Sequence, residues 1–312
     1  MTKNLELLFY PKSLALVGAS GNPQKIGYLI AKNILTSGYQ GESFLINPKL
    51  KELLENTVYP DLQVLPKTPE VLILAIPVAG ILAQIQTLAS LKNQLKESFQ
   101  TFAIIISAGF GETGSEGKIL ENQILEVAKK ANISIVGPNC LGIINNDSSS
   151  KYKYNGSFGF TPDISGNISL VSQSGAIISG LVDKACEQGF GFNKIISVGN
   201  KIDIEISDYI NYLENDPKTD VIAIYSEGYK NGQDLTETIR NTKKPVIMLK
   251  SGQSEKAKQA IGSHTGSIAG DGEVAKMYLQ KVNSIQVQNL EEFFNCLVLF
   301  QKYKSIPTKI LS

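Results

Sequence analysis

The sequence has no excess of either charge, no long hydrophobic run and few cysteines, and each absence excludes a class of protein. Thirty lysines and arginines stand against 29 aspartates and glutamates in 312 residues, so the formal net charge is +1. Nucleic-acid and membrane-surface binders usually carry a basic excess or stripe, which this chain lacks. No run reaches the ~18 apolar residues of a transmembrane helix, and the N-terminus lacks a signal-peptide core. We therefore expect a soluble, cytoplasmic protein with no nucleic-acid or membrane partner.

The three cysteines, Cys140, Cys186 and Cys296, are widely spaced and form no CxxC pair. An odd number at such spacing fits neither a disulfide framework nor a zinc site. We interpret them as buried thiols and predict no metal site.

Histidine is even scarcer, because His264 is the only one in the chain. It lies in the stretch 251–272, SGQSEKAKQAIGSHTGSIAGDG, which is rich in glycine and serine and has a helix-like pattern on both sides. A neutral imidazole can act as a nucleophile when a partner orients its ring. We therefore take His264 as a candidate nucleophile, with an incidental loop histidine as the alternative.

The hydrophobic content of 42% and the chain length predict two domains, since a domain usually has about 100–200 residues. Short apolar runs alternate with amphipathic segments, which is typical of βαβ units in a parallel α/β sheet. The polar stretch 145–166 separates two such series. We predict a first domain at 1–150, a second at 151–304, and a linker or the start of a missing domain at 305–312.

The predicted elements follow this alternation in both halves. In the first half we predict strands at 14–17, 43–46, 71–76, 102–106 and 133–136, with helices starting near Ile26, Val78 and Gly117. In the second half we predict strands at 168–171, 194–198, 221–225, 246–249 and 284–287, and helices at 176–188, 206–213, 235–242, 272–281 and 290–302.

Ligands of such sheets bind beyond the carboxyl ends of the strands. The first strand is followed by Gly18-Ala19-Ser20-Gly21, a flexible loop that opens a helix and can cradle a phosphate, although it is not GxGxxG. The second strand ends at Asn47-Pro48-Lys49, where an NAD site usually has an acid. Lys49 suits a phosphorylated ribose, as in CoA or NADP, unless it is only a solvated loop charge.

Two more glycine-rich turns follow the fourth and fifth predicted strands. They are Ser107-Ala108-Gly109-Phe110-Gly111-Glu112-Thr113-Gly114 and Gly137-Pro138-Asn139-Cys140-Leu141-Gly142. Neighbouring turns of this kind make a narrow, backbone-lined slot for a long thin ligand. The alternative is that they are only tight turns before helices.

The second half places unusual residues after its strands, and we expect the turns at 172–175, 199–203 and 227–228 to converge with the His264 loop. Glu227 can accept a hydrogen bond from the imidazole N–H, while the turn before Ala176 offers backbone N–H groups to a phosphate. Glu227 can instead be an ordinary loop carboxylate, and Asp203 a helix cap. A hydrolase using Ser174 and His264 is a further alternative, although the first glycine of GxSxG is absent.

Together these motifs resemble the nucleoside-diphosphate-forming acyl-CoA synthetases, including ADP-forming acetyl-CoA synthetase, and more distantly the succinyl-CoA synthetase alpha subunit. The resemblance covers nearly the whole chain. The motifs, in order, are VGAS (17–20), INPK (46–49), SAGFGETG (107–114), VGPNCLG (136–142), SLVSQSGA (169–176), SVGNKIDIE (197–205), YSEG (225–228) and SHTGSIAG (263–270).

The resemblance implies a Rossmann-like CoA-binding domain followed by a flavodoxin-like domain that carries phospho-His264. It implies that acyl-CoA and phosphate give an acyl phosphate, which phosphorylates His264, and that His264 passes the group to ADP. Glu227 would orient the histidine. The implied CoA-binding residues are Gly18, Ala19, Ser20, Gly21, Lys49, Ser107, Ala108, Gly109, Phe110, Asn139 and Cys140, and the implied phosphate-binding residues are Ser174, Gly175 and Ala176.

Family members also use an ATP-grasp domain, which binds ADP or ATP with Mg²⁺, and no such region is found in this sequence. We therefore expect an oligomeric ligase that acts on a CoA thioester and a small carboxylic acid with an ATP-grasp domain or subunit. A non-catalytic CoA- or nucleotide-binding regulatory module of the same fold is the alternative. The sequence leaves the acyl group open.

Overall fold

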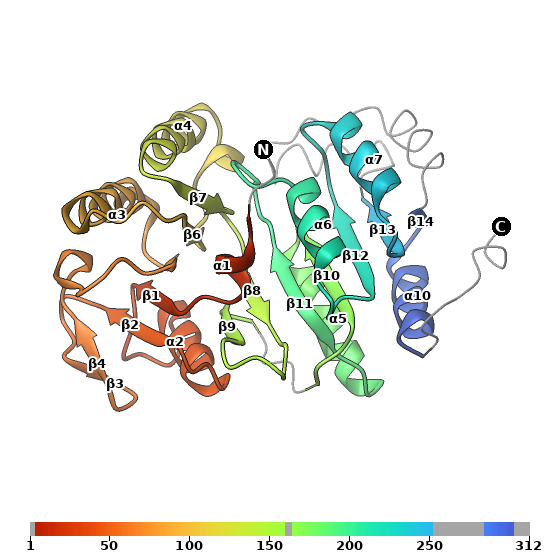
Figure 1. Ribbon diagram of the computed structural model, residues 1–312, viewed down its shortest axis with the longest axis horizontal. Helices are drawn as coiled ribbons and strands as arrows, with labels where there is room; N and C mark the ends of the chain where they lie inside the picture. The colour runs from red at the N-terminus through yellow and green to blue at the C-terminus, as the bar shows by residue number, and fades with distance from the viewer. Residues whose placement is uncertain (1–3, 160–163, 252–283, 303–312) are drawn as a thin grey trace. The chain divides into compact units, whose positions relative to one another are not determined.

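A computed structural model describes residues 4–159, 164–251 and 284–302 (Figure 1). The chain divides into two compact units, one formed by Lys3–Thr161 with Ser197–Glu205, the other by Pro162–Ile196 with the chain from Ile206 onward. The helix predicted at 272–281 lies outside the described residues, and the boundary at 150 stays a prediction. Within the described ranges, no helix has the length and apolar character to cross a membrane.

The first unit is built on a sheet in the order β3-β4-β2-β1-β5-β6-β7. The chain leaves β1 for β2 on one side and returns to β5 on the other, so the first strand lies at the topological switch point where such sheets bind ligands. The parallel strands are β1 (Ser13–Val17), β2 (Glu42–Ile46), β4 (Asn56–Tyr59), β5 (Val71–Leu74), β6 (Thr101–Ile105) and β7 (Ile133–Val136), while β3 (Glu52–Leu53) pairs antiparallel with β4.

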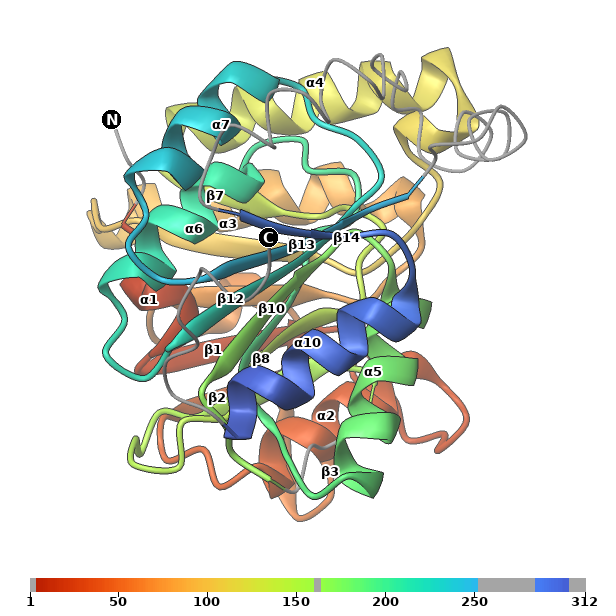
Figure 2. The same cartoon turned by 90° about the vertical axis from the view of Figure 1, so that its right-hand side faces the viewer.

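Helices cover both faces of this sheet, α2 (Ile26–Thr36) on one and α3 (Ile81–Leu95) with α4 (Ser115–Lys130) on the other (Figures 1 and 2). Alternate strand residues such as Ala15 and Val17 join α3 and α4 in one buried cluster, as the two-residue period of a strand requires. The helix predicted from Val78 begins instead as the 3₁₀ turn η2 (Val78–Gly80). Two further 3₁₀ turns, η1 (Leu62–Val64) and η3 (Gly111–Thr113), and the short helix α1 (Glu6–Phe9) complete the described helical elements of this unit.

Two strands around the polar stretch 145–166 were not predicted. Strands β8 (Gly142–Asn145) and β9 (Tyr154–Ser157) form an antiparallel hairpin, and every residue of β9 is buried. The side chain of Asn155 accepts from the backbone N–H and hydroxyl of Ser157 at 3.1 and 2.7 Å. Because polar groups satisfy one another inside the hairpin, the sequence shows no apolar alternation there.

The second unit contains the parallel strand series β14-β13-β12-β10-β11. Helices α5 and α10 lie on one face and α6 and α7 on the other (Figures 1 and 2). The strands are β10 (Ile168–Ser172), β11 (Phe192–Ser197), β12 (Val221–Ser226), β13 (Val246–Lys250) and β14 (Ser284–Val287), and the helices are α5 (Gly175–Glu187), α6 (Ile206–Asn215), α7 (Gly232–Asn241) and α10 (Leu290–Lys302). The predicted α/β class and the order of two such domains are confirmed.

A buried ion pair fixes the amino end of this second sheet. The Lys194 ammonium lies 2.6 Å from Asp216 Oδ2, and both side chains are almost fully buried. Asn193 and Thr219 donate to the same carboxylate oxygen at 2.9 and 2.6 Å. The charge of Asp216 is therefore compensated by one cation and two neutral donors, as a buried carboxylate requires.

The cysteines differ from the expected set of buried thiols. Cys140 is buried, but Cys186 is exposed and Cys296 is half-buried. Cys186 lies near the end of the amphipathic helix α5, where its side chain faces solvent, so sequence spacing did not reveal its exposure. Within the described part of the chain, no group of three or more His, Cys, Asp or Glu side chains could hold a metal ion.

Candidate functional site

The loop after β1 depends on glycine for its shape. Gly18 has φ +96°, and a Cβ on it would lie 2.3 Å from the carbonyl oxygen of Ala75. A Cβ on Gly27, in the first turn of α2, would lie 1.9 Å from Gly18 O. The start of α2 therefore packs directly on the loop, and its first backbone N–H groups lie beside Gly18, where an anion is favoured.

The loop after β2 is tied to the loop after β1 by one amide side chain. Asn47 Nδ2 donates to Ala19 O at 2.6 Å, and Asn47 Oδ1 accepts from the backbone N–H of Lys49 at 2.7 Å. Ser20 Oγ accepts from the backbone N–H of Asn22 at 3.2 Å. The candidate residues Gly18 to Gly21 and Lys49 thus belong to one local cluster, with the Lys49 side chain exposed to solvent.

The two glycine-rich turns after β6 and β7 also lie together. The backbone N–H of Asn139 donates to Ser107 O at 2.9 Å. Ala108 is exposed and Gly109 is half-buried, so this backbone faces the surface. Phe110, by contrast, is fully buried, and its ring belongs to the core. Phe110 therefore supports the loop from below.

Cys140 is buried beneath these turns. Its Sγ donates to Ile105 O at 3.3 Å, and burial raises the pKa of the thiol to about 12. The thiol is neutral at physiological pH and cannot act as a nucleophile.

Two carboxylates hold the loop after β6 from within. Glu112 Oε1 accepts from the backbone N–H of Gly109 at 2.6 Å, and Glu121 Oε1 accepts from that of Gly111 at 3.0 Å. Asn200 Nδ2 donates to both carboxylates, at 2.6 Å to Glu112 and 3.2 Å to Glu121. Sequence reasoning missed the roles of all three side chains, because Asn200 lies far from both acids in sequence and only the fold brings them together.

Asn200 lies in the segment Ser197–Glu205, which groups with the first unit. The backbone N–H groups of Asn200 and Ile202 donate to Pro138 O and Gly137 O at 2.9 and 3.2 Å. Asp203 Oδ2 accepts from the backbone N–H of Ile135 at 2.8 Å. The turn 199–203 was expected to converge with the turns of the second unit, but these contacts join it to the loops of the first.

In the second unit, the turn after β10 opens helix α5. Ser174 is the N-cap of α5, and its hydroxyl accepts from the backbone N–H of Ile177 at 3.4 Å. The backbone N–H of Ser174 donates to Ser172 Oγ at 3.1 Å. Since the first N–H groups of a helix have no intrahelical partner, those of Gly175 and Ala176 are candidate donors to an anion at this end.

Gln173 connects this turn with Glu227. Its Oε1 accepts from the Ser226 hydroxyl at 2.7 Å, the Glu227 N–H at 2.8 Å and the Gly228 N–H at 3.1 Å. The side chain of Gln173 is buried. The structure therefore brings the phosphate-binding candidates and Glu227 together through an amide that sequence reasoning missed. His264, the predicted nucleophile, lies outside the described residues.

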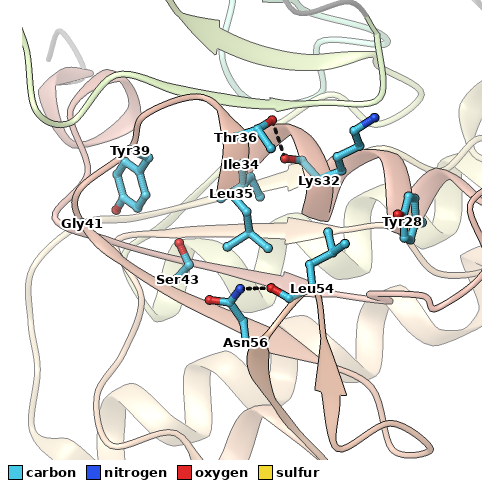
Figure 3. Close-up of a pocket in the computed structure, with 10 residues that line it drawn as sticks. All are labelled: Tyr28, Lys32, Ile34, Leu35, Thr36, Tyr39, Gly41, Ser43, Leu54 and Asn56. Carbon is cyan, nitrogen blue, oxygen red and sulfur yellow. Dashed lines mark hydrogen bonds between the residues drawn. The ribbon is translucent and has the colours of Figure 1, made fainter.

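A cavity of about 550 Å³ opens between α2 and the edge of the first sheet. Figure 3 shows Tyr28 and Lys32 of α2 at one end, with Tyr39 and Ser43 at the start of β2 at the other. Ligands of doubly wound sheets bind at the carboxyl ends of the strands, whereas this cavity reaches the amino end of β2. We therefore do not include it in the candidate site.

Comparison with known proteins shows the family to which the chain belongs. Residues 12–146 match the family described as a CoA binding domain, and residues 165–300 match the succinyl-CoA ligase like flavodoxin domain. The alpha subunit of ADP-forming acetate–CoA ligase I of Pyrococcus furiosus is 35% identical over 298 residues. The chain belongs to the ADP-forming acyl-CoA synthetase family. Within it, the chain corresponds to the CoA-binding, alpha-subunit-like portion.

Other relatives in this synthetase family show the same correspondence. The 4-hydroxybutyrate–CoA ligase [ADP-forming] of Nitrosopumilus maritimus is 36% identical over 94% of the chain. The solved structure of dinucleotide forming acetyl-coenzyme A synthetase 1 of Ca. Korarchaeum cryptofilum, in complex with phosphate and ADP, superposes with a TM-score of 0.85 at 31% identity over 94% of the chain. The resemblance inferred from the motifs is confirmed.

The chain spans only part of these synthetases. It covers 62% of the Pyrococcus subunit, 41% of the Nitrosopumilus ligase and 61% of the Korarchaeum chain. It therefore spans about half the length of the relatives that it matches.

Proposed function

We propose that this chain binds CoA through its first unit and carries the phosphohistidine of an ADP-forming acyl-CoA synthetase in its second domain. The overall reaction converts an acyl-CoA, inorganic phosphate and ADP into a carboxylic acid, CoA and ATP. One observation carries the proposal: hydrogen bonds draw together the strand-end loops of the unit matched to a CoA-binding domain. The only histidine, His264, falls within the second matched domain.

The first unit suits the phosphates of CoA. The loop of Gly18 to Gly21 and the start of α2 present backbone N–H groups, which favour an anionic pyrophosphate. Lys49, held next to this loop through Asn47, supplies a cation for the phosphate on the CoA ribose. The exposed backbone at Ala108 and Gly109, with Asn139 beside it, would line the path of the pantetheine arm.

The proposed chemistry proceeds by three displacements. An oxygen of inorganic phosphate attacks the thioester carbonyl, the C–S bond breaks, and the CoA thiolate leaves. An imidazole nitrogen of His264 then attacks the phosphorus of the acyl phosphate, and the carboxylate leaves. Finally an oxygen of ADP attacks the same phosphorus, the N–P bond breaks, and ATP forms.

The second unit supplies the electrostatics of these steps. Backbone N–H groups of Gly175 and Ala176, with Ser174 as the N-cap, would hold the phosphoryl group. Glu227, fixed by Gln173, would accept the ring N–H of His264 and leave its other nitrogen free to attack. Positioning and charge stabilisation of this kind are what phosphoryl transfer mainly requires.

An ATP-grasp domain or subunit completes the proposed enzyme. It would bind ADP or ATP with Mg²⁺ and receive the phosphoryl group from His264. We propose that the complete enzyme is a cytoplasmic oligomer and that its acid substrate is a small carboxylic acid.

Binding of CoA tests the first half of the proposal. Isothermal titration should show saturable binding of CoA to the full chain and weaker binding of 3′-dephospho-CoA, which lacks the ribose phosphate. K49A should weaken CoA binding about tenfold and abolish this preference, since one charge-assisted contact is lost. K51A, at an exposed lysine two residues away, is the matched control. Equal binding of CoA and 3′-dephospho-CoA by the wild type would contradict the role of Lys49.

The alternative is a regulatory module that binds CoA without catalysing a reaction. Phosphorylation of His264 distinguishes it from the proposed synthetase. Binding of CoA with no phosphorylation of His264, in the presence of an ATP-grasp partner and a series of acyl-CoA thioesters with phosphate, would establish that alternative.

A further inference from the structure

The side chain of Asn200 lies between two acidic residues of the first unit. Its backbone is fixed from one side, because the Asn200 N–H donates to Pro138 O at 2.9 Å. A Cβ on the preceding residue, Gly199, would lie 2.1 Å from the same carbonyl oxygen, so the segment packs tightly on the turn after β7. Asn200 Nδ2 then reaches the loop after β6, where it contacts Glu112 and Glu121.

Each carboxylate also holds a backbone N–H of that loop. Glu112 Oε1 binds the N–H of Gly109 and Glu121 Oε1 binds that of Gly111, at 2.6 and 3.0 Å. A Cβ on Gly111 would lie 2.8 Å from a carboxylate oxygen of Glu121, so a larger residue would push this carboxylate out of its contact. The loop is therefore shaped by its two acids, and the acids are held together by Asn200.

The electrostatics require a donor at this position. Burial raises the pKa of Glu112, but hydrogen bonds from Asn200 and from backbone N–H groups outweigh burial and hold the pKa below its ordinary value. Glu112 is therefore ionised at neutral pH. The two hydrogens on Asn200 Nδ2 supply one donor to each carboxylate. Without them, two partly buried carboxylates would face each other with only backbone N–H groups as donors, which is costly.

We propose that Asn200 is a positioning residue for CoA: its side-chain amide fixes Glu112 and Glu121, and thereby holds the loop after β6 against the turn after β7 in the arrangement that binds the ligand. This inference rests on the proposed function, because it assumes that these loops bind CoA. Asn200 itself need not touch the ligand. Its effect passes through the backbone of Gly109 and Gly111.

The variants N200D and E112Q test the inference. Aspartate is nearly isosteric with asparagine but replaces the donor with a third carboxylate, and glutamine at 112 places an amide donor opposite the Asn200 donor. Each substitution should raise the Kd for CoA about tenfold, since each removes a charge-assisted hydrogen bond. The double variant N200D/E112Q reverses donor and acceptor at the shorter contact but leaves the new carboxylate at position 200 facing Glu121, so it should recover part of the affinity that N200D loses. Hydrogen exchange at Gly109 and Gly111 should quicken in N200D, and exchange at Gly109 should slow again in the double variant.

N122D is the matched control, because it adds the same charge at an exposed position next to Glu121. A simple charge effect on anionic CoA would weaken N122D as much as N200D and would strengthen E112Q, and either result would overturn the inference. Wild-type affinity in both single variants would overturn it while leaving the proposed function intact. If the wild type does not bind CoA, the proposed function fails and this inference with it. If N200D does not fold, the CoA affinity of E112Q decides the outcome.

Discussion

The two units each join a pair of strand-end turns with one amide side chain, but the two amides act with opposite polarity. In the first unit, Asn200 donates to the carboxylates of Glu112 and Glu121. In the second, the carbonyl oxygen of Gln173 accepts from three donors around Glu227. The comparison shows that carboxylates beside a loop are held by a side-chain donor, whereas a turn whose backbone N–H groups point inward is held by a side-chain acceptor.

Because the two amides act with opposite polarity, the two units leave different backbone groups for a ligand. In the first unit, the chain's own carboxylates occupy the N–H groups of Gly109 and Gly111, so this loop offers shape more than charge. In the second unit, the cap uses the N–H of Ile177, and the first N–H groups of α5 lie at the positive end of the helix dipole, which favours an anion. This difference fits a thin neutral arm in the first unit and a phosphoryl group in the second.

The largest expected effect on stability comes from a carboxylate that pairs with a charged group. Asp216 binds the Lys194 ammonium, whereas Glu112 of the first unit binds a neutral amide. D216N removes the carboxylate that pairs with the fully buried Lys194 ammonium, so the free energy of unfolding at pH 7 should fall by about 3–5 kcal/mol. Urea denaturation would measure this loss. D183N, at an exposed acid of α5, should leave stability unchanged. A similar loss in both variants would contradict the account.

The buried Asp216 carboxylate also predicts how stability changes with pH. Burial raises its pKa, but hydrogen bonds from Lys194 and Thr219 outweigh burial and hold the pKa below the ordinary value of 3.8. Because the folded-state pKa is the lower one, the stabilisation is complete above the unfolded-state pKa and is lost as the pH falls through the folded-state value. Stability should therefore decline below about pH 4, and D216N should flatten this decline.

The second prediction concerns a substitution that disrupts the packing around Asn200. Gly199 has φ +52°, and a Cβ on it would lie 2.1 Å from Pro138 O. G199A should therefore cost about 3 kcal/mol of unfolding free energy through strain and a backbone clash. G180A in helix α5 of the second unit is the control, because a Cβ there meets no atom within 4 Å. It should stabilise by about 0.5–1 kcal/mol, and a destabilised G180A would show that the difference is not local.

The third effect removes the amide of the second unit. Q173L removes an oxygen that accepts three hydrogen bonds and should cost about 2–3 kcal/mol, while Q173E keeps an acceptor oxygen and should retain most of the stability. Q173L should also slow phosphorylation of His264 without changing the Kd for CoA. Weakened CoA binding by Q173L would contradict the division of roles between the units.

The smallest effect compares two thiols. The pKa of Cys140 is raised by burial to about 12, whereas Cys186 is exposed on α5. Iodoacetamide should modify Cys186 in the native protein and leave Cys140 unmodified, because the thiolate is the reactive form. Peptide mass spectrometry with and without denaturant would measure both rates. Rapid native modification of Cys140 would show that the turn above it opens.

The fold was largely predictable because most of its strands and helices have apolar residues at regular spacing, which predicts the element from sequence. Strand β14 and helix α10 match the predicted ranges, and β1, β7 and β12 differ by a residue at most. The hairpin β8 and β9 was missed because its buried positions include Asn155 and Ser157, which satisfy each other. The short strands β3 and β4, the two outermost on one side of the first sheet, carry too few apolar residues to give a period.

The position of the candidate residues at strand ends was predictable where a motif directly follows a strand, as at Gly18, Asn139 and Ser174. The supporting side chains were not, because Asn200 and Gln173 act across distances in sequence that only the fold closes. Asn200 was also assigned to the wrong region, since the segment after β11 returns to the first unit. A neutral amide side chain stands out neither by charge nor by hydropathy, so the sequence did not predict the roles of Asn200 and Gln173.

Phosphorylation of His264 tests the central claim most directly. The chain, with an ATP-grasp partner, Mg²⁺ and ATP labelled on its γ-phosphate, should gain an acid-labile, base-stable label that ADP removes, whatever the acyl substrate is. H264N should remain unlabelled, and Q173L should be labelled more slowly than the wild type. An H264N chain labelled as fully as the wild type would contradict the account.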